Sequence, residues 1–243
     1  MMTPLVGWVS LLAFPQVLCR HQVRVGVIRL YYDDLPEARA RALALTVDDR
    51  LRASGLADTI KPARVFLFQR PAGYRWITRL SRVPREAQGF NLSVLGNTFV
   101  SGPRVAALGE QSGRSPRYSV WEGDPAHTIA HEVGHQYVVD RIGRRALPQW
   151  KREGLAEYIA NIGLIRADST ADLVSRLAVF DDDQAWRATG GSARRGWDRI
   201  HYEAGLVVEF LIDVQGYTLA DVAADSVTQE GARTALRAWA EPR

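Results

Sequence analysis

The chain has 243 residues, of which 47% are hydrophobic and 24% are charged. That balance is typical of a globular protein large enough to bury its own core, and it excludes disordered, collagen-like and coiled-coil chains. The net charge is +4 and no run of five Lys or Arg occurs, so the sequence gives no support for nucleic-acid binding. A single cysteine, Cys19, excludes an intrachain disulfide framework and a cysteine-based zinc site.

Residues 1–19 contain no charged side chain. As a helix rising about 1.5 Å per residue they would just cross a hydrocarbon core of about 30 Å, which makes them a candidate membrane anchor. Pro4 and Pro15 interrupt the stretch, so the alternative is a buried N-terminal strand or helix in a soluble protein. Arg20 and Arg24 follow it and favour a cytoplasmic location for the rest of the chain. Further arginines upstream would reverse that orientation, so the sequence does not decide on which side of the membrane the rest of the chain lies.

The remaining residues, 20–243, are expected to form one catalytic domain, with a sheet-containing part over 20–122 and a helical part over 123–243. Alternating apolar residues predict a strand over 22–32, and an apolar stripe of helical period predicts a helix over 36–54 that ends at Gly55. The further elements that we predict are a strand over Val65–Phe68, a helix over Tyr74–Leu80, a strand over Leu92–Val100 with a break at Gly96-Asn97, a loop over 101–117, a strand over Tyr118–Trp121 and helices from Pro125 onward. The fold class is therefore α+β, with a small sheet in a mixed α/β N-terminal half and a mostly helical C-terminal half.

His131 and His135 lie four residues apart within an apolar stretch, and Glu132 directly follows the first histidine. Residues i and i+4 share one face of a helix about 6 Å apart, so two imidazoles can reach one ion at the ~2.0–2.1 Å of a zinc–nitrogen bond. Glu132 lies about 100° around the helix, beside the ion, where it can take a proton from a water that zinc acidifies. The alternative is a core helix whose histidines bind no metal.

A third zinc ligand has to come from another part of the chain. A site of three histidines spaced as H-E-x-x-H-x-x-G-x-x-H is excluded, because Val138 and Arg141 stand where it needs Gly and His. His127 is about 12 Å of helix rise from His135 and cannot share its ion. We expect His127 to lie at the start of the helix, facing solvent or the edge of a cleft.

A second helix is predicted through Trp150–Ile159, with Glu153 and Glu157 on one face. Two carboxylates beside apolar residues are costly to bury unless cations or hydrogen-bond donors pair with them. We assign Glu153 as the third zinc ligand and Glu157 as the acceptor for the ring N–H of a ligating histidine. The alternative is a solvated pair of glutamates. Gly134 and Gly154 would let the two helices approach closely.

The run His131-Glu132-Val133-Gly134-His135, followed after 17 residues by Glu153-Gly154-Leu155-Ala156-Glu157-Tyr158, resembles the zinc site of the gluzincin metallopeptidases. These are the thermolysin-like and aminopeptidase-like enzymes of the peptidase MA-like superfamily. The resemblance covers about residues 90–225 and implies a thermolysin-like zincin fold, a Zn²⁺ cofactor and a peptide or protein substrate.

A second match begins at Tyr202 and continues through Gly205 into an apolar run. It resembles the helix of zinc aminopeptidases that begins with a Tyr, and it implies that the Tyr202 hydroxyl stabilises the tetrahedral intermediate at the entrance of a helix over 202–212. His201 is the alternative donor. The G-x-M-E-N loop of the aminopeptidases has no counterpart here, so recognition of a free amino terminus is not implied.

These features together predict a zinc-dependent metallopeptidase with three protein ligands, Glu132 as general base and Tyr202 as oxyanion donor. By analogy with the family, the strand over 92–100 is expected to bind an extended substrate through backbone pairing. Two alternatives stay open. One is a zinc-dependent amidase with a non-peptide substrate, and the other is a membrane-tethered scaffold domain that keeps zinc for stability and turns nothing over.

Overall fold

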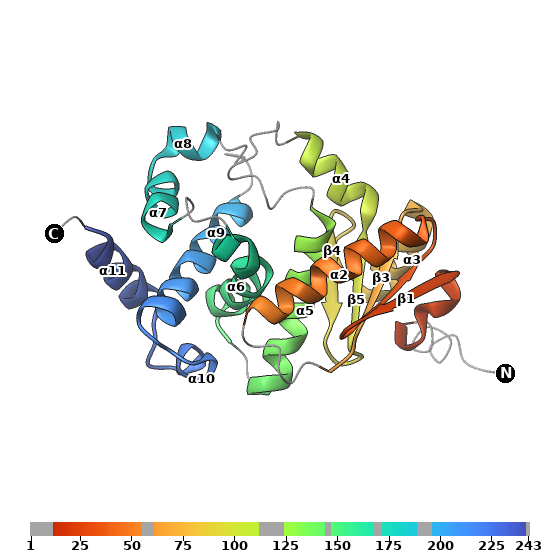
Figure 1. Ribbon diagram of the computed structural model, residues 1–243, viewed down its shortest axis with the longest axis horizontal. Coiled ribbons are helices and arrows are strands. Elements are labelled where there is room, and N and C mark those ends of the chain that lie inside the picture. Colours follow the sequence, from red (N-terminus) through yellow and green to blue (C-terminus); the bar gives the residue numbers. More distant parts are fainter. Residues whose placement is uncertain are drawn as a thin grey trace.

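The computed structural model describes residues 12–54, 61–111, 124–143, 147–167, 172–188 and 196–241. These residues form an α+β fold, as predicted. A five-stranded mixed sheet lies at one end of the molecule, and the C-terminal half, which is helical, extends away from it (Figure 1).

The sheet has the strand order β1-β2-β3-β5-β4. Its strands are β1 (His21–Val25), β2 (Ile28–Tyr32), β3 (Ala63–Phe68), β4 (Gly89–Leu92) and β5 (Asn97–Ser101). The three central strands β2, β3 and β5 are parallel, whereas β1 and β4 run antiparallel to their neighbours at the two edges. The predicted strand over Val65–Phe68 is confirmed as β3.

Both ends of the sheet are hairpins where the sequence predicted single strands. The prediction of one strand over 22–32 is wrong, because Gly26 adopts a φ of +49° and turns the chain between β1 and β2. The carboxylate of Asp48 holds this turn by accepting a hydrogen bond from the Val27 N–H at 2.9 Å. The predicted strand over 92–100 is likewise divided, because only Leu92 belongs to β4 and residues 97–100 belong to β5. Strand β5 pairs with β3 on one side and β4 on the other, so the expectation that the strand over 92–100 is a free edge for a substrate is wrong for this part.

Two helices cover the opposite faces of the sheet, and both were predicted. In Figure 1, α2 (Glu37–Ala53) crosses in front of the strands and α3 (Pro71–Ser81) lies behind them. The face under α2 is aliphatic, with a core of Val23, Leu30, Val65, Ala40, Ala44, Val47 and Leu51. The face under α3 is aromatic, with a core of Phe66, Phe68, Phe90, Phe99, Tyr74 and Ile77. Gly55, the predicted end of the first helix, lies outside the described residues.

Helix α4 (Gly102–Gln111) corrects the predicted loop over 101–117. Glycine and polar residues made this segment read as irregular, but Val105 is fully buried, and its packing favours the helix over local propensity. Residues 112–117 and the predicted strand Tyr118–Trp121 lie outside the described residues.

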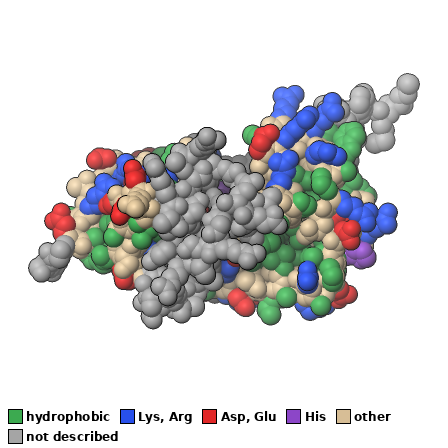
Figure 2. Space-filling model, turned by 90° about the horizontal axis from the view of Figure 1, so that it is seen from above, with side chains coloured by type: hydrophobic (Ala, Val, Ile, Leu, Met, Phe, Trp, Pro, Cys, Tyr) green, Lys and Arg blue, Asp and Glu red, His purple; other side chains and the backbone are tan. Residues whose placement is uncertain are grey.

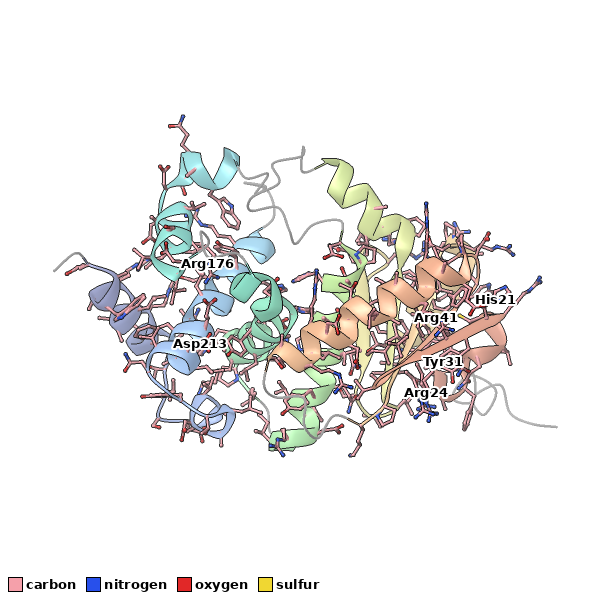
Figure 3. The ribbon with its side chains drawn as sticks, in the orientation of Figure 1. His21, Arg24, Tyr31, Arg41, Arg176 and Asp213 are labelled. Carbon is pink, nitrogen blue, oxygen red and sulfur yellow. The ribbon has the colours of Figure 1, made fainter. Side chains whose placement is uncertain are left out.

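The described residues from Pro125 onward are mostly helical, as predicted. Its elements are α5 (Pro125–Ile142), α6 (Gln149–Ala167), α7 (Leu173–Asp181), α8 (Asp183–Ala188), α9 (Gly196–Glu209), the π-helical turn η3 (Phe210–Val214), α10 (Leu219–Ala223) and α11 (Gln229–Ala240). Helix α6 packs against both α5 and α9. Further from the sheet, Arg176 of α7 makes a buried ion pair with Glu209, and Asp213 accepts a hydrogen bond from the Tyr158 hydroxyl at 2.8 Å (Figure 3).

Residues 1–11 of the candidate membrane anchor lie outside the described residues, and the structure describes residues 12–19. Pro15–Leu18 form a short 3₁₀ turn, η1, and Cys19 is buried beneath it against the aromatic face of the sheet. None of the helices among the described residues is long and apolar enough to cross a bilayer.

Candidate metal centre

Helix α5 is fixed at its start by Asp124. One oxygen of the Asp124 carboxylate accepts a hydrogen bond from the Ala126 N–H at 2.8 Å, and the other pairs with the Arg50 guanidinium of α2 at 2.6 Å. Pro125 occupies the first turn, where its missing N–H costs nothing. The helix then passes β4 and β5, so that its histidines face the interior between the sheet and α6.

The structure brings His131, His135 and Glu153 together. Oε2 of Glu153 lies 3.4 Å from Nε2 of His131 and 3.3 Å from Nε2 of His135. A tetrahedral zinc site with bonds of ~2.05 Å has neighbouring ligand atoms about 3.3 Å apart. These two distances match that spacing, and all three residues offer ligand atoms within 4.8 Å of one another, so they are placed to hold one zinc ion. The second oxygen of Glu153 pairs with Arg152 at 3.0 Å, which leaves Oε2 for the metal.

Glu157 lies behind this group. Its Oε1 is 3.0 Å from Nδ1 of His131, on the side of the ring away from Glu153. The pair lacks the geometry of a hydrogen bond, but a carboxylate at this distance favours a proton on Nδ1, which would leave the Nε2 lone pair free for a metal.

His127 is buried, which corrects the expectation of a histidine facing solvent or a cleft edge. Its Nε2 lies 3.1 Å from Oε2 of Glu157, and the Asn161 amide donates to the same oxygen at 3.0 Å. His127 and Asn161 continue the spacing of four residues found in each helix, because His127 lies four positions before His131 and Asn161 lies four positions after Glu157. That repeat is the sequence signal that could have found them.

A row of histidines on α5 thus faces a row of polar residues on α6. Helix α5 carries His127, His131 and His135, and α6 carries Glu153, Glu157 and Asn161. The helices are antiparallel, because the later histidine contacts the earlier glutamate. His127, His131 and Glu157 form a second group whose ligand atoms also lie within 4.8 Å of one another. The first group is the better candidate for a metal, because in the second group Glu157 Oε2 already has hydrogen-bond partners in His127 and Asn161.

Gly134 and Gly154 do not serve the same contact. A Cβ on Gly134 would lie 3.2 Å from the Ala156 Cα, so this glycine brings α5 close to α6 as expected. A Cβ on Gly154 would lie 2.6 Å from Val208 Cγ2 and nearer still to the Ala204 carbonyl oxygen. Gly154 therefore sets the approach of α6 to α9 and not to α5.

The histidines and glutamates of this cluster carry opposite charges and shift one another's pKa values. Burial acts to lower the pKa of His131, but the carboxylates of Glu157 and Glu153 outweigh it and hold that pKa well above its usual range. Burial acts to raise the pKa of Glu153 and of Glu157, but the histidines outweigh it and hold both far below the usual range. The glutamates are therefore ionised at neutral pH, as metal ligation requires.

Glu132 lies beside the cluster on the side of the sheet. A Cβ on Gly89 of β4 would come within 3.1 Å of Glu132 Cγ, so the side chain packs directly against this strand. Burial raises the pKa of Glu132, and the nearby His135 and His131 offset the rise only in part. A carboxylate with a raised pKa is a stronger base near neutral pH than an ordinary one.

Tyr202 lies in the middle of α9, so the expectation that it begins a helix is wrong. Its ring packs on Trp186 at 5.1 Å and on Phe180 at 6.3 Å, and the side chain is buried. The residue at the metal centre is His201, which stacks on His131 at 5.9 Å and has its Nε2 3.8 Å from Oε2 of Glu153. One residue along a helix rotates a side chain by about 100°, which separates the two environments.

The edge of the sheet nearest to α5 is β4. Gln88 and Ser101 form a hydrogen-bonded pair, since the Ser101 N–H donates to the Gln88 carbonyl at 2.8 Å. Hydrogen-bonded and non-hydrogen-bonded pairs alternate along antiparallel strands, so the next pair, Gly89 with Val100, and the pair of Asn91 with Thr98 are not hydrogen-bonded. The backbone groups of Gly89 and Asn91 therefore point away from β5. Among the described residues no strand pairs with this outer edge. Its open positions begin at Gly89, beside Glu132.

Neither family models nor curated proteins give a match to this chain. The assignment of a metal centre consequently depends on the geometry of its own residues.

Proposed function

We propose that this protein is a zinc-dependent metallopeptidase of the gluzincin type. The observation that carries the proposal is the approach of Glu153 Oε2 to Nε2 of His135 and of His131, at 3.3 and 3.4 Å, with the Glu132 carboxylate within electrostatic reach of both histidines. Three protein ligands leave one position of a tetrahedral ion open, which is typical of catalytic and not of structural zinc. When bound, zinc supplies a Lewis acid that acidifies water and polarises a carbonyl group.

Glu132 acts as the general base. Its half-buried side chain lies near the candidate metal ligands, and desolvation raises the pKa of its carboxyl group. It takes the proton of the attacking water and then delivers it to the nitrogen of the departing amine.

The outer edge of β4 orients the substrate. An extended peptide that pairs with the outward backbone groups of Gly89 and Asn91 lies along the sheet edge, with its scissile carbonyl beside Glu132. Backbone pairing of this kind needs a peptide, and it favours peptide bonds over small acylated amines as substrates. This observation favours the peptidase over the amidase.

His201 takes the place of Tyr202 as the donor to the oxyanion. Its ring stacks on the ligating His131, whereas the Tyr202 ring packs among aromatic residues of α7 and α8. An N–H of imidazole is a suitable donor to an oxygen that gains negative charge in the transition state.

The test is a cleavage assay with a peptide library on zinc-loaded protein and on the Glu132→Gln variant. The variant keeps size and fold but lacks the base, so we expect equal zinc content and a turnover about 10²–10⁴-fold lower. Equal peptide turnover in the two proteins would contradict the mechanism. Cleavage of acylated amines without cleavage of peptides would favour the amidase, and zinc binding without any turnover would favour the scaffold.

A further inference from the structure

Helix α3 is amphipathic and basic. Its inner face packs Tyr74, Ile77 and Thr78 into the aromatic core. Its outer face presents Arg75 and Arg79, which are exposed, with Trp76 exposed to 59% of its surface. Tryptophan is rarely left this open to water, whereas a tryptophan flanked by arginines is common in helices that lie on a membrane surface.

A second apolar patch lies over the same face of the sheet. Leu12, Leu18 and Cys19 pack into the aromatic core that α3 covers. Between them, Phe14 and Val17 are 65% and 78% exposed. Two separate elements on one face thus expose large apolar side chains while their neighbours are buried.

Positive charge concentrates around these patches. Residues 70–86 contain five arginines and one acid. Lys and Arg side chains gather on the half of the molecule that carries the sheet (Figure 2).

Arg24, Arg29 and Arg64 form a row across β1, β2 and β3, because the register pairs Arg24 with Arg29 and Arg29 with Arg64. The alternation along the strands puts this row on the aromatic face, two positions from Tyr31 and Phe66. Like charges directly opposite one another destabilise a sheet unless an anion neutralises them.

Only some of the N–H groups in this row of arginines have hydrogen-bond partners among the described residues. Arg64 donates to the carbonyl oxygens of Ala13 and Leu95 and so joins the N-terminal segment to the sheet. Nε of Arg29 is buried and has no hydrogen-bond partner among the described residues. Arg24 lies at the sheet end of the molecule, well away from the helical half (Figure 3).

We propose that the face formed by α3 and residues 12–19 docks on an anionic lipid bilayer. Arginines attract the headgroups, and Trp76, Phe14 and Val17 enter the boundary between headgroups and acyl chains. The apolar, uncharged residues 1–11 lead directly into this face at Leu12, whose carbonyl oxygen accepts a hydrogen bond from Asn97 at 2.7 Å. A soluble phosphate or a phosphopeptide would use the arginines but would leave the exposed apolar residues without a role.

The test measures co-sedimentation of the full chain with vesicles of phosphatidylcholine alone and of phosphatidylcholine with one part in three phosphatidylglycerol. We expect binding to the anionic vesicles that weakens at high salt. Arg75→Glu combined with Arg79→Glu should weaken it by at least about 30-fold. Trp76→Ala should weaken binding at every salt concentration, because it removes apolar contact and not charge.

The matched control is Arg39→Glu combined with Arg41→Glu, two exposed positions on α2, the helix that covers the opposite face of the sheet from α3 (Figure 1). It makes the same change in net charge and should leave binding within about threefold of the parent. Equal loss in both double variants, or no loss in the α3 variant, would overturn the proposal. So would α3-dependent self-association without vesicle binding, which would identify a second copy of the chain as the occupant. Thermal unfolding of each variant shows whether it is folded, and none of these readouts depends on zinc or on peptidase activity.

Discussion

Glu153 and Glu157 lie one helical turn apart on α6 and have different neighbours. Glu153 shares one oxygen between Nε2 of His131 and Nε2 of His135, whereas Glu157 reaches Nδ1 of His131 and Nε2 of His127. The first arrangement places an oxygen where a metal can bind, and the second orients the imidazole that binds it.

Substitution of the two glutamates should separate these roles. We expect Glu153→Ala to lose most of the one zinc ion per chain, because a ligand is removed. Glu157→Ala should weaken zinc affinity only about 10–100-fold, because the imidazole remains but is less well oriented. Metal analysis and competition with a chromogenic chelator measure both effects. If Glu157→Ala emptied the site and Glu153→Ala did not, the two assignments would be exchanged.

His201 and Tyr202 are adjacent but face different parts of the molecule. We expect His201→Phe to lower kcat by roughly 10²–10³, the usual effect of losing one oxyanion donor, with little change in zinc content. Tyr202→Phe keeps the ring that packs on Trp186 and should leave kcat within a few-fold of the parent. Steady-state kinetics on a cleaved peptide measure the contrast. A large fall in kcat for Tyr202→Phe alone would restore the tyrosine as the donor.

At the scale of elements, helix α6 is the centre of the helical half. One of its faces meets the histidines of α5, and another meets α9 so closely that Gly154 has no room for a side chain. Glu153 is adjacent to Gly154 in sequence, so the packing of α6 on α9 also positions the proposed metal ligand.

A methyl group at position 154 should therefore lower the stability of the protein. Gly154→Ala would place a Cβ 2.6 Å from Val208 Cγ2 and against the backbone of Ala204, and we expect a loss of about 1–3 kcal/mol in the free energy of unfolding. Gly205→Ala faces the Glu157 Cβ at 3.1 Å and should cost less, since a side chain can move further than a backbone. Denaturant unfolding in the presence of a chelator compares the two. An equal cost, or a smaller one at Gly154, would show that α6 and α9 pack less closely.

At the scale of the whole molecule, the buried cluster of histidines and glutamates links stability to pH. Burial acts to lower the pKa of His131, but its carboxylate neighbours raise it above 6.5, so its contribution to stability is complete below that pH and is lost as pH rises through the folded-state pKa. The pKa values of Glu153 and Glu157 are lowered from 4.5, so their contribution is present above that pH and is lost as pH falls through the folded-state values.

The metal-free protein should accordingly be most stable between about pH 4.5 and 6.5. Zinc requires neutral imidazoles, so the stabilisation that zinc adds should instead grow as pH rises toward 8. Thermal unfolding from pH 4 to 9, with a chelator and with zinc, measures both curves. A metal-free Tm that rose between pH 6.5 and 8 would contradict the charge pairing that we describe.

The sequence alone determined the features that depend on local spacing. Helical period gave α2 and α3, and the H-E-x-x-H spacing with Glu153 and Glu157 gave the residues that the structure brings together. These predictions were accessible because residues four apart on a helix share a face whatever the helix packs against. Gly26 shows the limit of periodicity, since one residue in the left-handed region turned a predicted strand into a hairpin.

Only the tertiary structure decided which way each side chain of the second half of the chain faces. His127 is buried because α6 brings Glu157 and Asn161 opposite it, and neither contact is visible from α5 alone. Tyr202 and His201 exchanged their expected places because α9 begins six residues earlier than predicted and α7 and α8 supply aromatic partners. The physical reason is the same in each case: the local sequence specifies the spacing of side chains along a helix, but the face that is buried depends on neighbours that are distant in sequence.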